Sequence, residues 1–325
     1  MPIKLIVRPD VPVWTPQQFI SETPRFSIAL DGIVAGGSWY DPGTRHANFN
    51  HHDCFSRLAV RATCEQVYVA IVQGFFSAFN NGRSVELNIY ANDCDEDVCF
   101  SVYLLRNRKA VGRESNGRLR RLVETEGKID ATGGTYRLTT TATIWSELAW
   151  IFEPYRHFRM SGEIFAKDPD AFGAIIDEVG ERIAENVHGR GKTLDINSGM
   201  LRYRRIGGGE GWSMIVEDGE YGRRGAIDDG IEAFVTVQQR PDGRFAYTIG
   251  RISEWIPFDI HGLLNHLNRV EHLDNCVDRW GGSDTIGGSP RLSGSSLDPA
   301  RVEAAINRFI RLNGRDGTST PFPQT

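Results

Sequence analysis

Strand-like segments alternate with helix-like segments through the first half of the chain, and this alternation limits the folds that it can adopt. Phe26–Gly37 is typical of a buried strand followed by a loop, and Ser84–Ala91 is typical of a strand rich in β-branched residues. Ser56–Phe79, Val98–Asn107 and Gly117–Gly134 carry apolar residues at helical spacing. The pattern predicts an α/β fold in which a mostly parallel sheet is flanked by helices.

The second half of the chain predicts a second, smaller α+β domain. Asp168 and Pro169 give an N-cap and first-turn signal for a helix, so we place the domain boundary near residues 159–168. A Pro-Asp-Gly turn at 241–243 separates two alternating runs, as in a β-hairpin, and a glycine- and serine-rich loop at 280–296 precedes a final helix. We expect one domain at 1–158, another at 159–313, and a disordered tail at 314–325.

Charge and hydropathy exclude several classes of protein. The 325 residues include 37 Lys and Arg against 42 Asp and Glu. This balance argues against a broad basic face for long duplex nucleic acid but leaves a short oligonucleotide in a local cleft open. No stretch reaches the ~18 to 20 apolar residues that span a bilayer, and no secretion signal is recognisable, so we expect a cytoplasmic protein without a membrane partner. The five cysteines lack the paired spacing of zinc sites and are expected to be reduced.

Histidines and carboxylates gather between Tyr40 and Asp53. His51 and His52 are adjacent, Asp53 follows them, and His46 lies five residues before His51. Imidazole and carboxylate ligands suit a divalent ion such as Mn²⁺, Fe²⁺ or Zn²⁺. Neighbouring side chains on a strand point to opposite sides, so on a strand one histidine would bind the ion and the other would face substrate. A surface loop with hydrogen-bonded histidines is the alternative interpretation.

A second cluster, at 92–97, lies where a predicted strand passes into a helix. Asp93 and Asp95 are two residues apart, so an extended turn would place them on one side, where a cation would relieve their repulsion. Asp97 is expected near the start of the following helix, where a carboxylate is favourable as a cap. A solvated acidic loop is the alternative.

Together the two clusters resemble the motifs of the DHH phosphoesterase superfamily, which includes RecJ-type nucleases and family II inorganic pyrophosphatases. Residues 34–53 (VAGGSWYDPGTRHANFNHHD) are similar to its histidine motif, and residues 88–105 (NIYANDCDEDVCFSVYLL) are similar to its DxD motif. The metal ligands that the resemblance implies are Asp93, Asp95, His51, Asp31 and Asp130. Asp31 is favoured over Asp41 because it ends a predicted strand, and strand ends commonly line an α/β crevice.

The order of the motifs departs from that of the family. The histidine motif precedes the DxD-like motif here, so the strands would be circularly permuted. This is admissible because a metal site needs ligands that are close in space, whatever their order in the chain. Two residues also differ: Asn50 stands where the first aspartate of DHH is expected, and Ala91 where a histidine often precedes DxD.

A glycine-rich loop extends the resemblance into the second half. Two-domain members of the family carry an associated domain whose glycine-rich loop helps to hold the substrate, and residues 280–291 resemble it without its histidine. Gly281, Gly282, Gly287 and Gly288 would let backbone N–H groups approach a phosphate, and Arg291 would add a bidentate contact. A flexible loop without a ligand is the alternative.

The resemblance implies a metal-dependent phosphoesterase that acts through metal-activated water. Its substrate would be a nucleotide, a short oligonucleotide or a small phosphorylated molecule. Mn²⁺ is expected, as one or two ions, with Mg²⁺, Fe²⁺ and Zn²⁺ as alternatives, while His52 and His46 would stabilise charge on the transferring phosphoryl group. The rival interpretation, which Asn50 and Ala91 motivate, is a noncatalytic nucleotide- or partner-binding module. The oligomeric state stays open.

Overall fold

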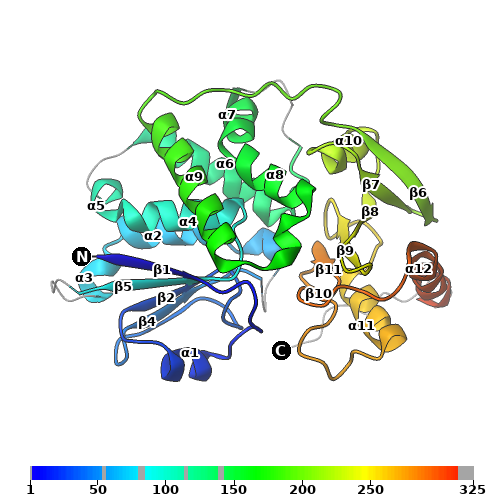
Figure 1. Cartoon of the computed structure of the whole chain (residues 1–325), viewed down its shortest axis with the longest axis horizontal. Helices are drawn as coiled ribbons and strands as arrows, with labels where there is room; N and C mark the ends of the chain where they lie inside the picture. The colour runs from blue at the N-terminus through cyan, green and yellow to red at the C-terminus, as the bar shows by residue number, and fades with distance from the viewer. Residues whose placement is uncertain (1, 53–55, 80–84, 113–115, 138–142, 314–325) are drawn as a thin grey trace. The chain divides into compact units, whose positions relative to one another are not determined.

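The computed structural model describes residues 2–52, 56–79, 85–112, 116–137 and 143–313. The chain forms two compact units, one made of Met1–Arg202 with Asp218–Gly225 and the other of Tyr203–Glu217 with Ala226–Thr325 (Figure 1). The short segment Asp218–Gly225 belongs to the first unit, although the chain on both sides of it belongs to the second.

The first unit contains a five-stranded sheet in the order β1-β5-β2-β4-β3. Its strands are β1 (Ile3–Val7), β2 (Ser27–Leu30), β3 (Trp39–Asp41), β4 (His46–Phe49) and β5 (Leu87–Ala91). β1 pairs in parallel with β5, β5 with β2, and β2 with β4, whereas β3 is antiparallel to β4. Strands β2, β4 and β5 therefore end at the same edge of the sheet.

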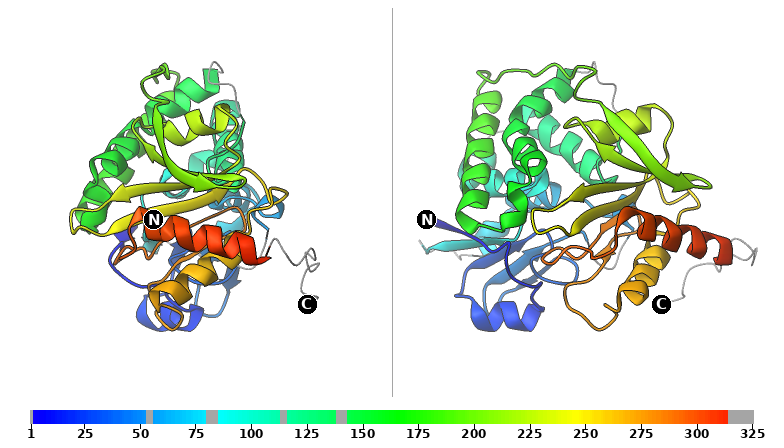
Figure 2. Two further views of the ribbon diagram at one scale, coloured as in Figure 1. Left: turned by 90° about the vertical axis from the view of Figure 1, so that its right-hand side faces the viewer. Right: turned by 45° about the vertical axis from the view of Figure 1, so that its right-hand side comes forward.

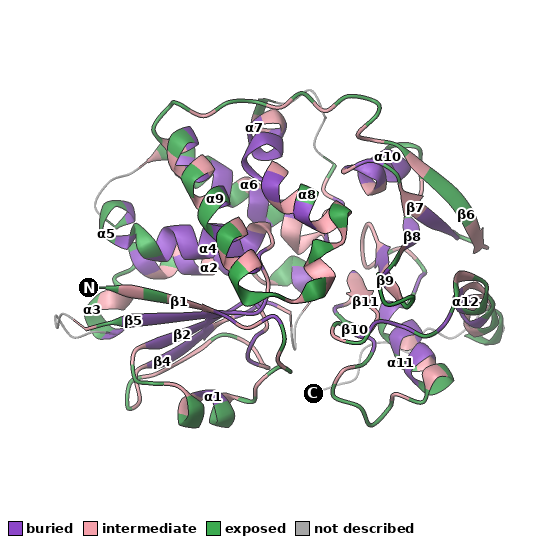
Figure 3. Cartoon of the chain, in the orientation of Figure 1, coloured by how far each residue is buried: buried purple, intermediate pink, exposed green. Residues whose placement is uncertain are grey.

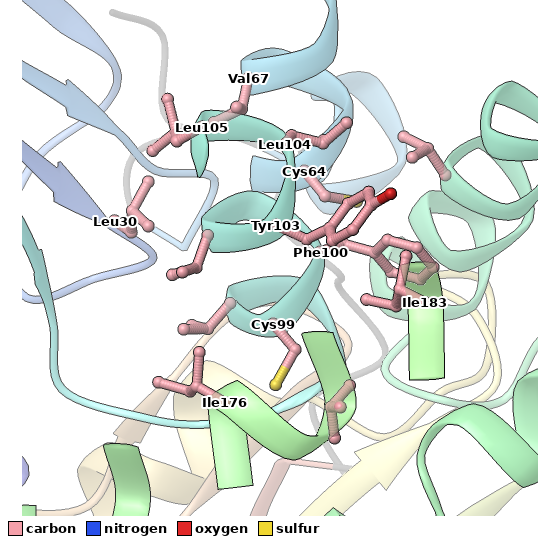
Figure 4. Close-up of a cluster of buried hydrophobic side chains, with 14 of the residues drawn as sticks. Leu30, Cys64, Val67, Cys99, Phe100, Tyr103, Leu104, Leu105, Ile176 and Ile183 are labelled. Carbon is pink, nitrogen blue, oxygen red and sulfur yellow. The ribbon is translucent and has the colours of Figure 1, made fainter. Parts of the chain in front are cut away.

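Helices cover both faces of this sheet. The helices of the unit are α1 (Pro16–Glu22), α2 (Thr63–Val72), α3 (Phe75–Phe79), α4 (Glu96–Arg106), α5 (Arg108–Val111), α6 (Gly117–Ala131), α7 (Thr143–Ile151), α8 (Glu153–Ser161) and α9 (Pro169–Val187), with short 3-10 turns η1 (Arg57–Ala59) and η2 (Glu163–Ala166). Because side chains alternate along a strand, Leu30 of β2 joins the core formed with α2 and α4, while Ala29 packs with Phe19 of α1 on the other face. Figure 4 shows Phe100 of α4 within the larger core, near Cys64 of α2.

The helical pattern predicted at Ser56–Phe79 is divided into η1, α2 and α3. Gly74, between α2 and α3, has a φ of 82°, a left-handed conformation that a right-handed helix cannot continue. The predicted helical structure is confirmed over most of this segment. The prediction of one continuous helix is wrong, because the conformation of Gly74 separates α2 from α3.

Helix α9 belongs to the core of the first unit. It packs against α4, α7, α8 and β1, and its buried residues Phe172, Ile176 and Val179 join the core cluster of α4. Figure 3 shows this mixture of buried and exposed positions along α9. The two units divide at Arg202 and Tyr203, so the expected boundary at 158/159 falls inside the core of the first unit.

The second unit is built on a six-stranded sheet in the order β10-β11-β9-β8-β7-β6. Its elements are β6 (Tyr203–Gly209), β7 (Trp212–Glu217), β8 (Ala233–Gln239), β9 (Phe245–Arg251), α11 (Ile260–Glu271), β10 (Gly281–Gly282), β11 (Ile286–Gly288) and α12 (Pro299–Asn313), while α10 (Gly222–Asp228) lies across the division. The predicted hairpin is confirmed as antiparallel β8 and β9. Helices α11 and α12 pack against each other, as Figure 2 also shows.

The chain thus has a mixed α/β fold with two mixed sheets flanked by helices, which confirms the expected fold class in this general form. The predicted final helix is α12, and at its start the Asp298 carboxylate accepts a hydrogen bond from Arg301 N at 2.9 Å. The tail predicted at 314–325 lies outside the described residues. Within the described ranges, no helix combines the length and the apolar character needed to cross a bilayer.

Candidate metal centre

The candidate centre lies where the parallel strands of the first sheet end. Asp31 directly follows β2, and His51 follows β4 by two residues. Leu30 and Phe49 are paired across the two strands, and Asp31 N donates to Phe49 O at 2.9 Å. The parallel register therefore brings the residues after β2 and β4 side by side.

Three carboxylates converge on the imidazole of His51. Its Nε2 atom lies 2.8 Å from Oδ2 of Asp130, 3.5 Å from Oδ1 of Asp31 and 3.7 Å from Oδ2 of Asp97. The His51 side chain is fully buried, at 0% exposure. Asp97 comes from α4 and Asp130 from the last turn of α6, so several elements meet at this point. The structure thus brings together three of the residues predicted as ligands: His51, Asp31 and Asp130.

His52 lies beside this group instead of pointing away from it. Its Nε2 is 2.9 Å from Oδ1 of Asp31, and its ring centroid is 4.7 Å from that of His51. Thr63 Oγ1 donates to the same Asp31 oxygen at 2.9 Å. Strand β4 ends at Phe49, so the alternation expected for two neighbouring histidines on a strand does not apply to His51 and His52.

Asp97 also belongs to this group, although the sequence predicted only a capping role for it. Its carboxylate accepts hydrogen bonds from the backbone N–H groups of Thr63, at 2.8 Å, and Cys64, at 2.6 Å. These are the first residues of α2, whose N-cap, Ala62, makes no side-chain capping bond. Asp97 therefore caps α2, although it lies in the first turn of α4. Ala62 at the N-cap position cannot cap the helix with its own side chain. This was the sequence signal that the capping group comes from another part of the chain.

Arg57 is a second residue that sequence reasoning missed. Its Nη2 atom lies 2.9 Å from Oδ2 and 3.1 Å from Oδ1 of Asp130, and 2.9 Å from Nε2 of His51. Its side chain is only 4% exposed. No spacing rule marks one arginine six residues after a histidine as part of a site, so no sequence signal would have found it.

The two aspartates of the DxD-like motif occupy the turn between β5 and α4. Asp93 Oδ1 accepts from Cys94 N at 2.8 Å, and Asp95 Oδ1 caps α4 by accepting from Val98 N at 3.0 Å. Among the described residues, the groups of side chains close enough to share a cation include neither of them. Burial, and then the charges of Asp31 and Asp93, raise the pKa of Asp95 well above its usual range.

Two other candidate residues of the first unit, His46 and Asp41, lie at the far end of β4 from His51. His46 is at the opposite end of β4 from His51, where its Nε2 contacts Thr23 Oγ1 at 3.0 Å and burial lowers its pKa. Asp41, the alternative to Asp31, stabilises the turn after β3, where its carboxylate accepts hydrogen bonds from Gly43 N and Thr44 Oγ1. The remaining predicted residues are Gly281, Gly282, Gly287, Gly288 and Arg291, all in the second unit, while Asp53 is outside the described residues.

The predicted glycine-rich loop contains two short paired strands. Gly281 pairs with Gly288, and Gly282 with Gly287, between β10 and β11. A Cβ atom on Gly282 would lie 2.2 Å from the Cα of Gly287, so these glycines allow close approach of two backbones. A role for them and for Arg291 in substrate binding stays a prediction.

Asn50 has a structural role that explains its amide. Its Nδ2 donates to Gly36 O at 2.8 Å and Val34 O at 3.3 Å, while its Oδ1 accepts from His52 N at 2.9 Å. The residue is buried, at 1% exposure. A carboxylate at this position could accept but could not donate, so the amide fits the carbonyl groups after β2 better than an aspartate would.

Charges within the group strongly perturb one another. Burial opposes ionisation of Asp31, but His52 and His51 outweigh it and hold its pKa well below the usual range. Burial also opposes charge on His51, yet Asp130 raises the imidazole pKa to about 10. Against the same effect of burial, Arg57 and His51 lower the pKa of Asp130 to about 2. Burial, Asp130 and Asp31 raise the pKa of Asp97 to about 7. The site thus contains more buried carboxylates than its own basic groups can fully compensate.

The residues present fit a divalent transition-metal ion. Two overlapping groups, Asp31 with His51 and His52, and His51 with Asp97 and Asp130, each place their ligand atoms within 4.8 Å of one another. Imidazole nitrogen and carboxylate oxygen are suitable ligands for such ions. Moreover, Nε2 of His51 cannot donate to Asp130 and accept from Arg57 at once, because a ring nitrogen carries either a proton or an available lone pair. A cation that accepts this lone pair would remove the conflict.

Comparison with known proteins gives no further indication of function. Neither the family models, nor the curated proteins, nor the solved structures contained a match to the chain.

Proposed function

We propose that the chain is a metal-dependent phosphoesterase that hydrolyses a phosphate ester of a nucleotide, short oligonucleotide or small phosphorylated molecule. The observation that carries this proposal is the convergence of Asp31, Asp97 and Asp130 on the buried imidazole of His51. A divalent ion, with Mn²⁺ favoured by the mixed nitrogen and oxygen donors, would lower the pKa of a water and offset charge on a phosphate oxygen.

His52 is the member of the group placed to meet a substrate. Its side chain is 36% exposed, whereas those of His51 and Asp31 are 0% and 4% exposed. Asp31 orients the ring through Nε2, and Thr63 in turn fixes the Asp31 oxygen. An imidazole oriented in this way can donate a hydrogen bond to a phosphoryl oxygen as negative charge develops there. His46 has no part in this chemistry, because it lies at the other end of β4.

Hydrolysis assays test the proposal. With Mn²⁺ present, the chain should release p-nitrophenol from bis(p-nitrophenyl) phosphate or mononucleotides from a dinucleotide, and EDTA should stop the reaction. His51→Ala and Asp31→Ala should each lower the rate by about 100-fold or more, because each removes a proposed ligand. His188→Ala is the matched control, since His188 is an exposed residue at the end of α9. Failure to hydrolyse any phosphomonoester or phosphodiester would contradict the proposal.

A noncatalytic binding module is the second candidate, and Arg57 favours it. A guanidinium that already pairs with both oxygens of Asp130 makes the carboxylates less dependent on a metal ion. This candidate predicts nucleotide binding, measured by calorimetry, without turnover and with little change in the presence of EDTA. Turnover that requires Mn²⁺ would exclude it.

A further inference from the structure

The candidate centre offers two neighbouring positions for a positive charge. One is bordered by Asp31, His51 and His52, and the other by His51, Asp97 and Asp130. His51 is common to both groups, so two cations there would share the same imidazole as a neighbour. The number of metal ions in the centre is therefore set by what fills each position.

Arg57 already supplies a charge at the second position. Its Nη2 atom is within 3.1 Å of both Asp130 oxygens and 2.9 Å from Nε2 of His51. A guanidinium stays protonated in proteins, and its planar N–H groups suit carboxylates. At 4% exposure, its charge is largely shielded from solvent and depends on these partners.

We infer that Arg57 takes the place of a second metal ion, so that the centre binds a single divalent cation, at the position bordered by Asp31, His51 and His52. This inference rests on the proposed function only in requiring a metal centre. With a cation at this position, Arg57 would keep its two contacts with Asp130, and His51 would offer the lone pair of Nε2 to the cation. The imidazole thereby loses the conflicting demands that Asp130 and Arg57 place on it.

Charge balance supports a single ion. Asp31, Asp97 and Asp130 are the three carboxylates near His51 Nε2, and when ionised they carry three negative charges. Arg57 and one divalent ion supply three positive charges. A second divalent ion would have to force the guanidinium from a buried position or leave excess positive charge beside it, and both are costly away from water.

Metal content measured on folded protein tests the inference. Chains saturated with Mn²⁺ and freed of excess ion are analysed by mass spectrometry for manganese per chain, and by electron paramagnetic resonance for coupling between ions. Wild type should hold one uncoupled ion. Arg57→Met and Arg57→Gln should each hold two, with the spectrum of a coupled pair. Arg57→Gln keeps a hydrogen-bond donor near Asp130, so it provides a folded variant should Arg57→Met unfold.

Arg108→Met is the matched control. Arg108 is another buried arginine of the first unit, but it donates to Leu105 O and lies over the ring of Phe76. This variant should hold one ion, like wild type. Two ions in wild type, or one ion in folded Arg57→Gln, would overturn the inference. Neither result would contradict the proposed metal-dependent phosphoesterase function. Wild type without bound manganese, zinc or iron would contradict the proposed function itself, and the inference with it.

Discussion

Asn50 organises the backbone beside the centre through both ends of its amide. It donates to the carbonyl groups of Val34 and Gly36 and accepts from the N–H of His52. These hydrogen bonds join the segment after β2 to the segment after β4. The amide of Asn50, which both donates and accepts hydrogen bonds, thus has a structural role at this position.

Asn50→Asp should destabilise the protein and should not add a metal ion. The substitution removes two donated hydrogen bonds and buries a charge, which should lower the free energy of unfolding by about 2 to 4 kcal/mol. Urea denaturation measures this change. Asn197→Asp is the control, because exposed Asn197 uses only its oxygen, which accepts from Gly199 N and Met200 N. Equal stability of Asn50→Asp and wild type would contradict the assigned role.

His51 should make the stability of the metal-free chain depend on pH. Asp130 and Asp31, against the opposing effect of burial, raise its pKa from 6.5 to about 10. A raised folded-state pKa stabilises the fold fully below pH 6.5, and this contribution is lost as the pH rises through about 10. In EDTA, the free energy of unfolding should therefore fall across this window. His51→Gln should remove much of that slope, and parallel slopes for the two chains would show that His51 is not responsible.

At the scale of elements, the candidate centre is joined to the packing of α2 and α4. Asp97 of α4 accepts from the first two N–H groups of α2, in place of a local capping side chain. One carboxylate thus fixes the N-terminus of a core helix and borders the candidate metal position. Any movement of α2 against α4 would alter the surroundings of His51.

Asp97→Ala should lower the free energy of unfolding by about 1 to 3 kcal/mol, because it leaves two buried donors without their acceptor. Adding Ala62→Ser should restore part of the loss. Ala62 has the extended backbone of an N-cap, with φ −54° and ψ 156°, and serine would supply a local acceptor. Thermal or urea melts of the single and double variants measure the effect. A stable Asp97→Ala chain would mean that the cap contributes nothing.

The β10–β11 pair gives a second prediction at this scale. A Cβ on Gly282 would meet the backbone of Gly287 at 2.2 Å, whereas a Cβ on Gly281 would come no closer than 3.9 Å, to Arg279 O. Gly282→Ala should therefore destabilise the second unit by about 2 kcal/mol, and Gly281→Ala should leave it almost unchanged. Limited proteolysis and urea melts of the two variants measure the difference. Equal tolerance at both positions would contradict the close pairing of the strands.

For the whole molecule, the local pattern of the sequence predicted most of the elements that position the centre. The runs that end at Leu30 and Ala91 are strands, and the amphipathic run that ends near Asp130 is a helix. The strand that ends at Phe49 was not predicted, so only the resemblance implied that Asp31 and His51 lie near each other. Whether these residues bind a metal stays a prediction.

What the sequence could not predict depends on contacts between distant segments. The roles of Arg57 and Asp97 arise only when η1, α2, α4 and α6 come together, and neither residue has a distinctive spacing. The division into units escaped prediction for a similar reason. Helix α9 has an ordinary N-terminal signal, but its packing against α4 and β1 places it in the first unit.

The most direct test of the central claim is anomalous scattering from a crystal of the protein soaked in Mn²⁺. Difference maps should show an ion bonded to Nε2 of His51 and to a carboxylate oxygen of Asp31, at about 2.0 to 2.3 Å. A map without an anomalous peak among these side chains, or with its strongest peak elsewhere in the chain, would contradict the account.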